Sequence, residues 1–265
     1  MADKIKLAMS NIAWDKADDE TVYTAMQAAG FTGLEVAPTR IFPQEPYENL
    51  TGAALFGGYL LNRWGFVVPS IQSIWYGQTG SIFRPDDAEA LLDYTAGAYR
   101  FAHALNCPSL VFGCPKNRML PEGHTPAEAD EFFSRAGTLA ARHGVRLAIE
   151  ANPPVYTNFL NGTREAFDLV KRLDNPGLSV NLDLSTMLTN GEQLRDFVDD
   201  LRYVGHIHIS EPGLAPIVKR PEHAELAMLL KAVGYQGFVS IEMRRPDEGV
   251  GPVLQAIETI AEVFA

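Results

Sequence analysis

The sequence is poor in cysteine, and its basic residues are scattered. Only Cys107 and Cys114 occur among 265 residues. They are too few for a disulfide framework and lack the CxxC spacing of a zinc site, so we expect two interior thiols in a reducing compartment. Lys and Arg number 22 against 33 Asp and Glu, giving a net charge of −11. Because a polyanion would have to bind against this field, nucleic acid is not expected as a partner.

Long apolar stretches are also missing. No run approaches the ~18 apolar residues of a membrane-spanning helix. The opening MADKIKLAMS lacks the pattern of a secretory signal. Linkers, low-complexity tracts and nucleotide-binding turns of the GxGxxG or GxxxxGK[ST] type are absent as well. We therefore expect a cytoplasmic protein with no membrane partner, in which residues 1–265 form one domain around a large core.

Short β-rich segments alternate with segments of helical period. Eight strands are expected, at residues 5–10, 33–38, 67–73, 109–114, 145–151, 178–184, 204–210 and 238–243. Amphipathic helices are expected between them, at 19–30, 87–106, 127–144, 163–174 and 223–234. Several of these end on glycine (Gly30, Gly144, Gly234), as helices commonly do. Strict alternation implies parallel strands, and eight units favour a closed (β/α)8 TIM barrel over an open sheet.

A TIM barrel carries its chemistry at the C-terminal ends of its strands. Polar residues stand at four consecutive ends, where the fifth to eighth expected strands finish: Glu150, Asp183, His208 and Glu242. Their spacing is close to one strand–helix unit each. We therefore expect the four side chains at similar height around one half of the barrel mouth.

Three carboxylates packed together repel one another or take up protons unless a cation lies among them. Two Glu, one Asp and one His suit a single divalent ion, Mn²⁺ in the first place, with Mg²⁺, Co²⁺ or Zn²⁺ as alternatives. The other interpretation is a network of buried ion pairs with Lys116, Arg146 or Arg244. His206 precedes His208 by two residues and points to the same face, one layer deeper. It is either a rival ligand or a histidine that hydrogen-bonds a ligand.

The segments IEAN, NLDLS, HIHISE and SIEMR together resemble the xylose isomerase-like TIM-barrel family, which includes sugar-phosphate isomerases and epimerases, ketose 3-epimerases and inosose dehydratase. The resemblance implies one metal ion held by Glu150, Asp183, His208 and Glu242. It also implies proton transfer beside a carbonyl through a cis-enediolate, with Glu150 and Glu242 as acid and base, and a homodimer or homotetramer. Epimerisation, aldose–ketose isomerisation and dehydration are all outcomes of such chemistry.

Three positions depart from the ketose 3-epimerase pattern. Where those enzymes have a substrate-binding Glu, His and Arg, this chain has Tyr156, Thr186 and Leu214. Lys219 and Arg220 are candidates for the role of the missing Arg. These departures argue against free-ketose 3-epimerisation as the specific activity. The leading hypothesis is a metal-dependent isomerase or epimerase of a small sugar or sugar derivative. A dehydratase or lyase on the same scaffold and a non-catalytic sugar-binding relict are the alternatives.

Substrate contacts are expected from the remaining loops at the barrel mouth. Lys116 and Arg118 follow the fourth strand and could pair with a substrate phosphate or carboxylate, or belong to a solvated loop. Glu211 is expected to orient a ligand or substrate, or to be a solvated charge. Further contacts are expected from residues around the ends of the other strands: Trp14, Glu35, Arg40, Trp75, Tyr76, Gln78 and Arg244.

Overall fold

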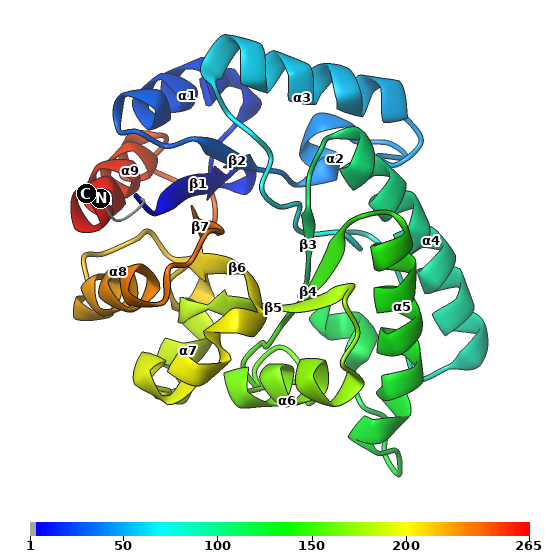
Figure 1. The fold of residues 1–265 in the computed structure, drawn as a ribbon. Helices are drawn as coiled ribbons and strands as arrows, with labels where there is room; N and C mark the ends of the chain where they lie inside the picture. Colours follow the sequence, from blue (N-terminus) through cyan, green and yellow to red (C-terminus); the bar gives the residue numbers. More distant parts are fainter. Residues whose placement is uncertain (1–3) are drawn as a thin grey trace.

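Parallel strands form a ring with helices around it (Figure 1). The structure, a computed structural model, describes residues 4–265. Its regular strands run in the order β2-β1-β7-β6-β5-β4-β3. They are β1 (Lys6–Ser10), β2 (Gly33–Glu35), β3 (Ser109–Phe112), β4 (Arg146–Glu150), β5 (Leu178–Asp183), β6 (Val204–Ile209) and β7 (Phe238–Ile241). Every strand pair is parallel, which confirms the expected TIM barrel.

The remaining place in the ring, between β2 and β3, holds an extended segment in place of the strand expected at 67–73. Val67 pairs with Gly33 of β2, and Ile71 pairs with Val36 just after β2 and with Leu110 of β3, as isolated parallel bridges. Pro69 lies between them and has no N–H to donate, so a regular ladder cannot run through this segment. The isolated bridges still close the ring.

The helices lie outside the ring and cover the strands. Those at expected positions are α1 (Asp19–Ala28), α4 (Pro85–Ala104), α5 (Asp130–Arg142), α6 (Thr163–Leu173) and α8 (Pro221–Val233). The structure also has α2 (Pro38–Ile41), α3 (Leu50–Trp64), α7 (Leu184–Asn190) and α9 (Gly251–Phe264), and short 3-10 segments such as η3 (Pro115–Arg118) and η6 (Pro212–Leu214) in the loops. Gly30, Gly144 and Gly234 have φ values of +81°, +71° and +66°, which glycine adopts without a Cβ clash.

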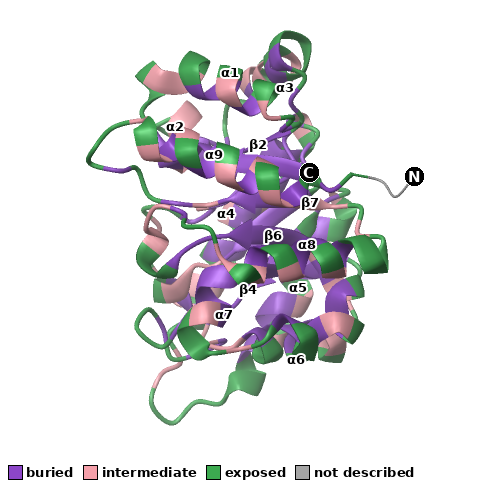
Figure 2. Ribbon diagram, turned by 90° about the vertical axis from the view of Figure 1, so that its left-hand side faces the viewer, coloured by how far each residue is buried: buried purple, intermediate pink, exposed green. Residues whose placement is uncertain are grey.

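The core fills the ring and the layer between strands and helices (Figure 2). The strands are buried, and the helices turn buried residues toward them and exposed residues outward. Leu34, Ile149, Val180 and Ile207, from four different strands, are completely buried. Each such side chain stabilises the fold by roughly 1.5–3 kcal/mol, so the strand ends form a rigid base for the loops that follow them. Between residues 4 and 265, no helix has the length and apolarity to cross a bilayer.

Candidate active site

A cavity of about 670 Å³ opens at the carboxyl ends of the strands. Its lining comes from residues 72–79 and from the loops that follow β3, β4, β5, β6 and β7. The carboxylate residues Glu150, Asp183 and Glu242 belong to this lining. A second cavity, of about 510 Å³, is lined at the opposite end of the barrel by residues such as Arg146 and Val204, where strands begin. Of these two cavities, the first lies where TIM barrels carry their active sites.

His208 brings two of the predicted ligands together. Its Nδ1 atom lies 3.1 Å from Oε2 of Glu150 and 3.3 Å from Oε2 of Glu242. The two glutamates reach it from the end of β4 and from the residue after β7, on either side of β6. Asp183 is the register partner of His208 on β5. The four residues therefore lie on four consecutive strands of the ring, as the sequence spacing predicts.

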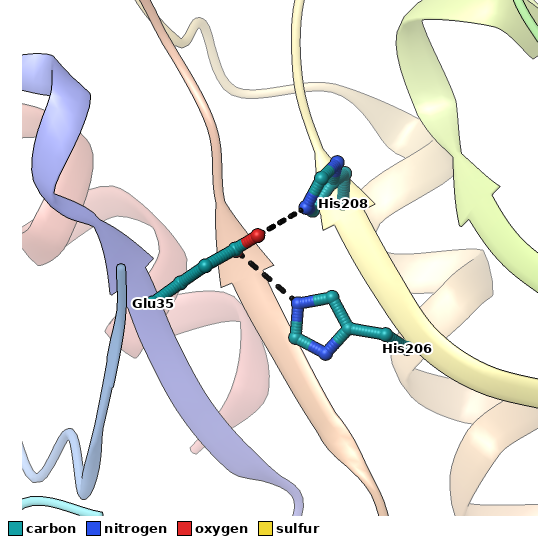
Figure 3. A group of neighbouring side chains, drawn as sticks. All are labelled: Glu35, His206 and His208. Carbon is teal, nitrogen blue, oxygen red and sulfur yellow. Dashed lines mark hydrogen bonds and ion pairs between the residues drawn. The ribbon is translucent and has the colours of Figure 1, made fainter. Parts of the chain in front are cut away.

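The other face of His208 is closed by Glu35 (Figure 3). Oε1 of Glu35 lies 2.9 Å from Nε2 of His208, and its Oε2 lies 3.2 Å from Nε2 of His206. Glu35 and His208 are 0% exposed and His206 is 1% exposed. This Glu35–His206–His208 cluster has its donor atoms close enough together to hold a metal ion. It lies beneath the cavity floor, and neither Glu35 nor His206 lines the cavity.

The charges of the cluster compensate one another. Burial alone would raise the pKa of Glu35, but the charges and hydrogen bonds of His208 and His206 lower it. Burial would lower the pKa of His208, but Glu35, Glu242 and Glu150 raise it well above the usual value. For His206 burial outweighs Glu35, and its pKa is lowered. When protonated, His208 donates from Nε2 to Glu35 and from Nδ1 toward Glu150 and Glu242. Without the Nδ1 proton, the lone pair of Nδ1 points toward Glu150 and Glu242.

Two amides hold the Glu150 carboxylate. Nδ2 of Asn152 donates to Oε1 at 2.8 Å, and Nδ2 of Asn181 donates to Oε2 at 2.6 Å. Beneath them, the fully buried Arg118 donates to the carbonyl oxygen of Glu150 at 2.7 Å and to Oδ1 of Asn152 at 2.9 Å. Burial would raise the pKa of Glu150, but His208 and the two amides together lower it. The carboxylate is thus fixed in place and kept ionised.

Glu242 lacks such donors. His208 is its only ion-pair or hydrogen-bond partner among the side chains of residues 4–265. Burial raises the pKa of Glu242 to about 7, with His208 opposing the shift and Glu150 and Glu35 adding to it. The two glutamates that meet at His208 therefore have different environments and different proton affinities.

Asp183 stands apart from the other three. Its carboxylate caps α7, accepting the N–H groups of Ser185 and Thr186 at 3.1 and 3.2 Å and the Thr186 hydroxyl at 2.9 Å. The Ser210 hydroxyl donates to it as well. Burial and the charge of Glu150 raise the pKa of Asp183. No hydrogen bond or ion pair of the described chain joins Asp183 to the other predicted ligands, and its four donors fill the acceptor sites of a carboxylate.

The ion-pair network considered as an alternative is not what the structure contains. Within residues 4–265, no Lys or Arg nitrogen lies within 4.0 Å of the carboxylates of Glu150, Asp183 or Glu242, whose only salt-bridge partner is His208. Lys116 and Arg244 are exposed. Glu150 and Glu242 thus share one imidazole, Asp183 has no salt-bridge partner, and no Lys or Arg pairs with any of the three acids in the described chain.

The residues expected to contact substrate divide into two groups. Tyr76 and Lys116 line the cavity, together with Trp75 and Gln78. The others lie elsewhere: Trp14, Glu35, Arg40, Arg118, Glu211 and Arg244.

Most of the expected substrate contacts that lie outside the cavity lining bind other protein groups instead. Trp14 is buried, donates to Asp19 at 2.8 Å, and borders a separate cavity of about 270 Å³. Asp19 also binds Arg40, at 2.6 Å. Buried Glu211 pairs with Arg220 at 2.6 Å. Arg118 is buried beneath the cavity, so its charge does not face an incoming anion. These contacts stabilise the loops that surround the mouth.

The three departures from the ketose 3-epimerase pattern also have defined positions. Tyr156 and Leu214 line the cavity. Thr186 is buried, and its hydroxyl lies 2.8 Å from the carbonyl oxygen of Ala151 and 2.9 Å from Oδ2 of Asp183, so that one proton serves both acceptors. This hydroxyl is committed to the protein, so Tyr156 and Leu214 are the departures that face a substrate.

Sequence reasoning did not single out Asn152 and Asn181. Each lies two residues from a predicted ligand, Asn152 after Glu150 and Asn181 before Asp183. Residues two apart on a strand face the same side, so alternation was a usable signal for Asn181. Asn152 lies beyond the end of β4, where alternation no longer applies.

The closed parallel ring with acids at its mouth defines the protein as a TIM barrel of the kind that carries a strand-end active site. The chain belongs to the xylose isomerase-like TIM barrel family, which it matches over residues 23–263. No curated protein sequence matches it.

Solved structures with this fold include sugar epimerases. The chain is similar to 3-keto-D-glucoside 4-epimerase from E. coli, with 16% identity, a TM-score of 0.78, and coverage of 98% of this chain and 99% of that one. It is also similar to D-psicose 3-epimerase from Clostridium cellulolyticum H10, with 18% identity, a TM-score of 0.72, and coverage of 97% and 92%. An IolI protein solved with a zinc atom shares 14% identity, with a TM-score of 0.70 and coverage of 98% and 96%. At these identities the likeness establishes the fold.

Proposed function

We propose that the protein is a divalent-metal-dependent isomerase or epimerase of a small sugar or sugar derivative, with Glu150 and Glu242 as its acid/base pair. One observation carries the proposal: two carboxylates from different strands converge on Nδ1 of His208 at 3.1 and 3.3 Å, beside a cavity. Similar folds that act as sugar epimerases support the reaction class.

The residues present fit a metal ion on the cavity side of His208. Three carboxylates without a Lys or Arg partner, two of them buried and that of Glu242 partly buried, form a site that favours a cation. Glu35 orients the imidazole of His208. Its carboxylate accepts from Nε2 and so leaves Nδ1 as the ligand atom, an arrangement common around metal-bound histidines. We propose Glu150, His208 and Glu242 as ligands and Asp183 as the fourth, which requires Asp183 to give up one of its present donors. Mn²⁺ suits this oxygen-rich set.

The Glu35–His206–His208 cluster is the competing location for a metal. It is sealed from the cavity, and its short N···O separations of 2.9 and 3.2 Å are those of ordinary hydrogen bonds. A metal in that cluster would not touch a substrate. We therefore assign Glu35 and His206 to the support of His208.

A bound divalent ion would polarise a substrate carbonyl and stabilise the negative charge that forms when the neighbouring C–H loses its proton. Glu150, ionised and held by two amides, is suited to remove that proton. Glu242, whose buried carboxyl has the higher proton affinity, is suited to return one. Because they approach from β4 and from beyond β7, the two groups reach different sides of a substrate between them. Return to the same carbon gives an epimer, and return to the adjacent carbon gives an isomer.

The test is isotope exchange in D₂O. The Mn²⁺-loaded protein is incubated with a panel of ketoses, aldoses, phosphosugars, keto-glycosides and inososes, and mass spectrometry follows deuterium at carbon. Incorporation that is lost in Glu150→Gln and in Glu242→Gln supports the proposal. Glu89→Gln, on the surface beside Arg135, is the matched control and keeps the activity. Loss of water from the substrate instead of simple exchange would indicate a dehydratase.

Metal stoichiometry of the same variants separates the two locations. A mouth site predicts that Glu242→Gln weakens Mn²⁺ binding more than His206→Asn does. The opposite order would place the ion in the buried cluster and would remove the basis for an acid/base role of Glu242.

A further inference from the structure

We propose that the outer part of the cavity binds an apolar or aromatic group joined to the sugar, so that the substrate is a conjugate such as a glycoside. This inference rests on the proposed function only in placing the sugar part at the acidic floor. Its basis is the contrast between the polar floor and the mostly apolar surface of the rest of the lining, which includes two exposed tyrosines.

The floor of the cavity is polar and buried. Glu150 and Asp183 are each 8% exposed, and Asn152 and Ser185 line the cavity beside them. These groups offer carboxylates, an amide and a hydroxyl, which suit the carbonyl and hydroxyl groups of a sugar.

Beyond these polar groups, most of the surface that lines the cavity is apolar. Two of its side chains are tyrosines from different loops, Tyr76 at 71% exposure and Tyr156 at 49% exposure. The other apolar members of the lining are Trp75, Val111, Pro115, Pro153 and Leu214. Lys116 is the only Lys or Arg that lines the cavity in the described chain. Scattered exposed aromatics need no explanation, but two that border one concave surface form a site for a flat apolar group.

Three of the seven non-glycine residues with positive φ in residues 4–265 line this cavity. Ser73, Cys114 and Leu214 have φ values of 55°, 41° and 54°, in the left-handed region that bulky residues avoid. Leu214 is kept there by its N–H bond to the carbonyl of Glu211 at 2.8 Å and by the N–H of Arg244, which donates to its carbonyl at 2.9 Å. Strain of this kind persists where the surroundings fix it, and it clusters at ligand sites.

The volume of the cavity also favours a substrate larger than a single sugar. The cavity holds about 670 Å³, within the range of roughly 300–1,000 Å³ of pockets that bury drug-sized ligands. A hexose has about twelve non-hydrogen atoms and would leave much of this space to water. A second ring attached to the sugar would fill part of the remaining space.

The test compares phenyl β-D-glucoside with methyl β-D-glucoside by titration calorimetry on the Mn²⁺-loaded protein. Burial of the ring is expected to make the phenyl compound bind about 10- to 100-fold more tightly. Tyr76→Ala and Tyr156→Ala should each reduce this ratio by several-fold, while Tyr156→Phe should retain it. Tyr59→Ala is the matched control, because Tyr59 is 50% exposed on α3 and does not line the cavity.

Equal affinities for the two glucosides, or no measurable binding of the phenyl compound, would overturn the inference. A ratio that survives in both alanine variants would overturn it as well. The outcome is independent of the proposed reaction: a phenyl preference without isotope exchange would refute the function and leave the subsite. Isotope exchange of free sugars without a phenyl preference would do the reverse.

Discussion

Replacing Glu35 by glutamine removes one charge from the interior while nearly preserving shape. The wild-type carboxylate accepts from Nε2 of both His206 and His208. Glutamine has one oxygen and one NH₂ group, so it can accept from one imidazole only and must face the other with a donor. If the NH₂ group faces His208, the hydrogen bond from Nε2 is lost; if the oxygen faces it, a neutral acceptor replaces a carboxylate and holds the Nε2 proton less strongly.

The expected consequence is weaker metal binding at the mouth. Removing a carboxylate that hydrogen-bonds a metal-ligating histidine typically costs 10- to 100-fold in affinity, about 1.4–2.8 kcal/mol. Calorimetric titration with Mn²⁺ measures this, and Glu89→Gln serves as the surface control. Thermal unfolding, monitored by circular dichroism, verifies that the variant is folded.

Two results would refute this reasoning. An unchanged dissociation constant in a folded Glu35→Gln variant would show that Glu35 does not prepare His208 for a metal. A loss as large as that of Glu242→Gln or larger would show that Glu35 is itself a ligand, and would move the ion to the buried cluster.

Three further predictions concern stability. Arg118→Met leaves the carbonyl of Glu150 and Oδ1 of Asn152 without their donor, so the free energy of unfolding in urea should fall by about 2–4 kcal/mol; a loss near zero would mean that water replaces the guanidinium. Burial would raise the pKa of Asp200, but Lys171 and Arg164 lower it overall. The ionised Asp200 therefore stabilises the fold fully above the unfolded pKa of about 3.9, and this contribution is lost as pH falls through the lower folded pKa. Asp200→Asn should therefore cost about 1–3 kcal/mol at pH 7 and much less near pH 2 in urea titrations, and an equal cost at both would contradict the assignment. A Cβ at Gly177 would lie 1.8 Å from a carbonyl oxygen of α5, whereas one at Gly58 of α3 meets nothing within 4 Å. Gly177→Ala should therefore destabilise the protein by about 1–3 kcal/mol and lower the melting temperature, and Gly58→Ala should stabilise it by about 0.5–1 kcal/mol and raise that temperature. Shifts of the same sign would contradict the packing described.

The positions of the strand ends were predictable because they follow from repeat length. Glu150, His208 and Glu242 meet because parallel strands of one barrel finish at one end, and the sequence contains that regularity. The missing third strand was predictable only in part: the apolar pattern of 67–73 is that of a strand, but Pro69 removes a donor from the ladder.

The depth of each side chain was not predictable. Glu35 and Arg118 were expected to meet a substrate, and both lie buried among protein partners. Spacing along the chain gives the end of a strand, but strand tilt and the register of neighbours decide whether a side chain turns inward or toward the mouth. The engagement of Asp183 by Ser210 depends on contacts between two strands that no pattern within one segment contains.

The interrupted position in the ring has a consequence for how such a barrel can change over evolutionary time. Residues 72–79, which follow the bridged segment, supply seven of the 22 residues that line the cavity. Isolated bridges join the segment to its neighbours, whereas regular ladders hold the strands that carry the acids. A lineage could therefore exchange this stretch for another of different length or composition without disturbing the register of β4, β6 and β7, and so acquire new ligands while its proton-transfer groups remain where they are.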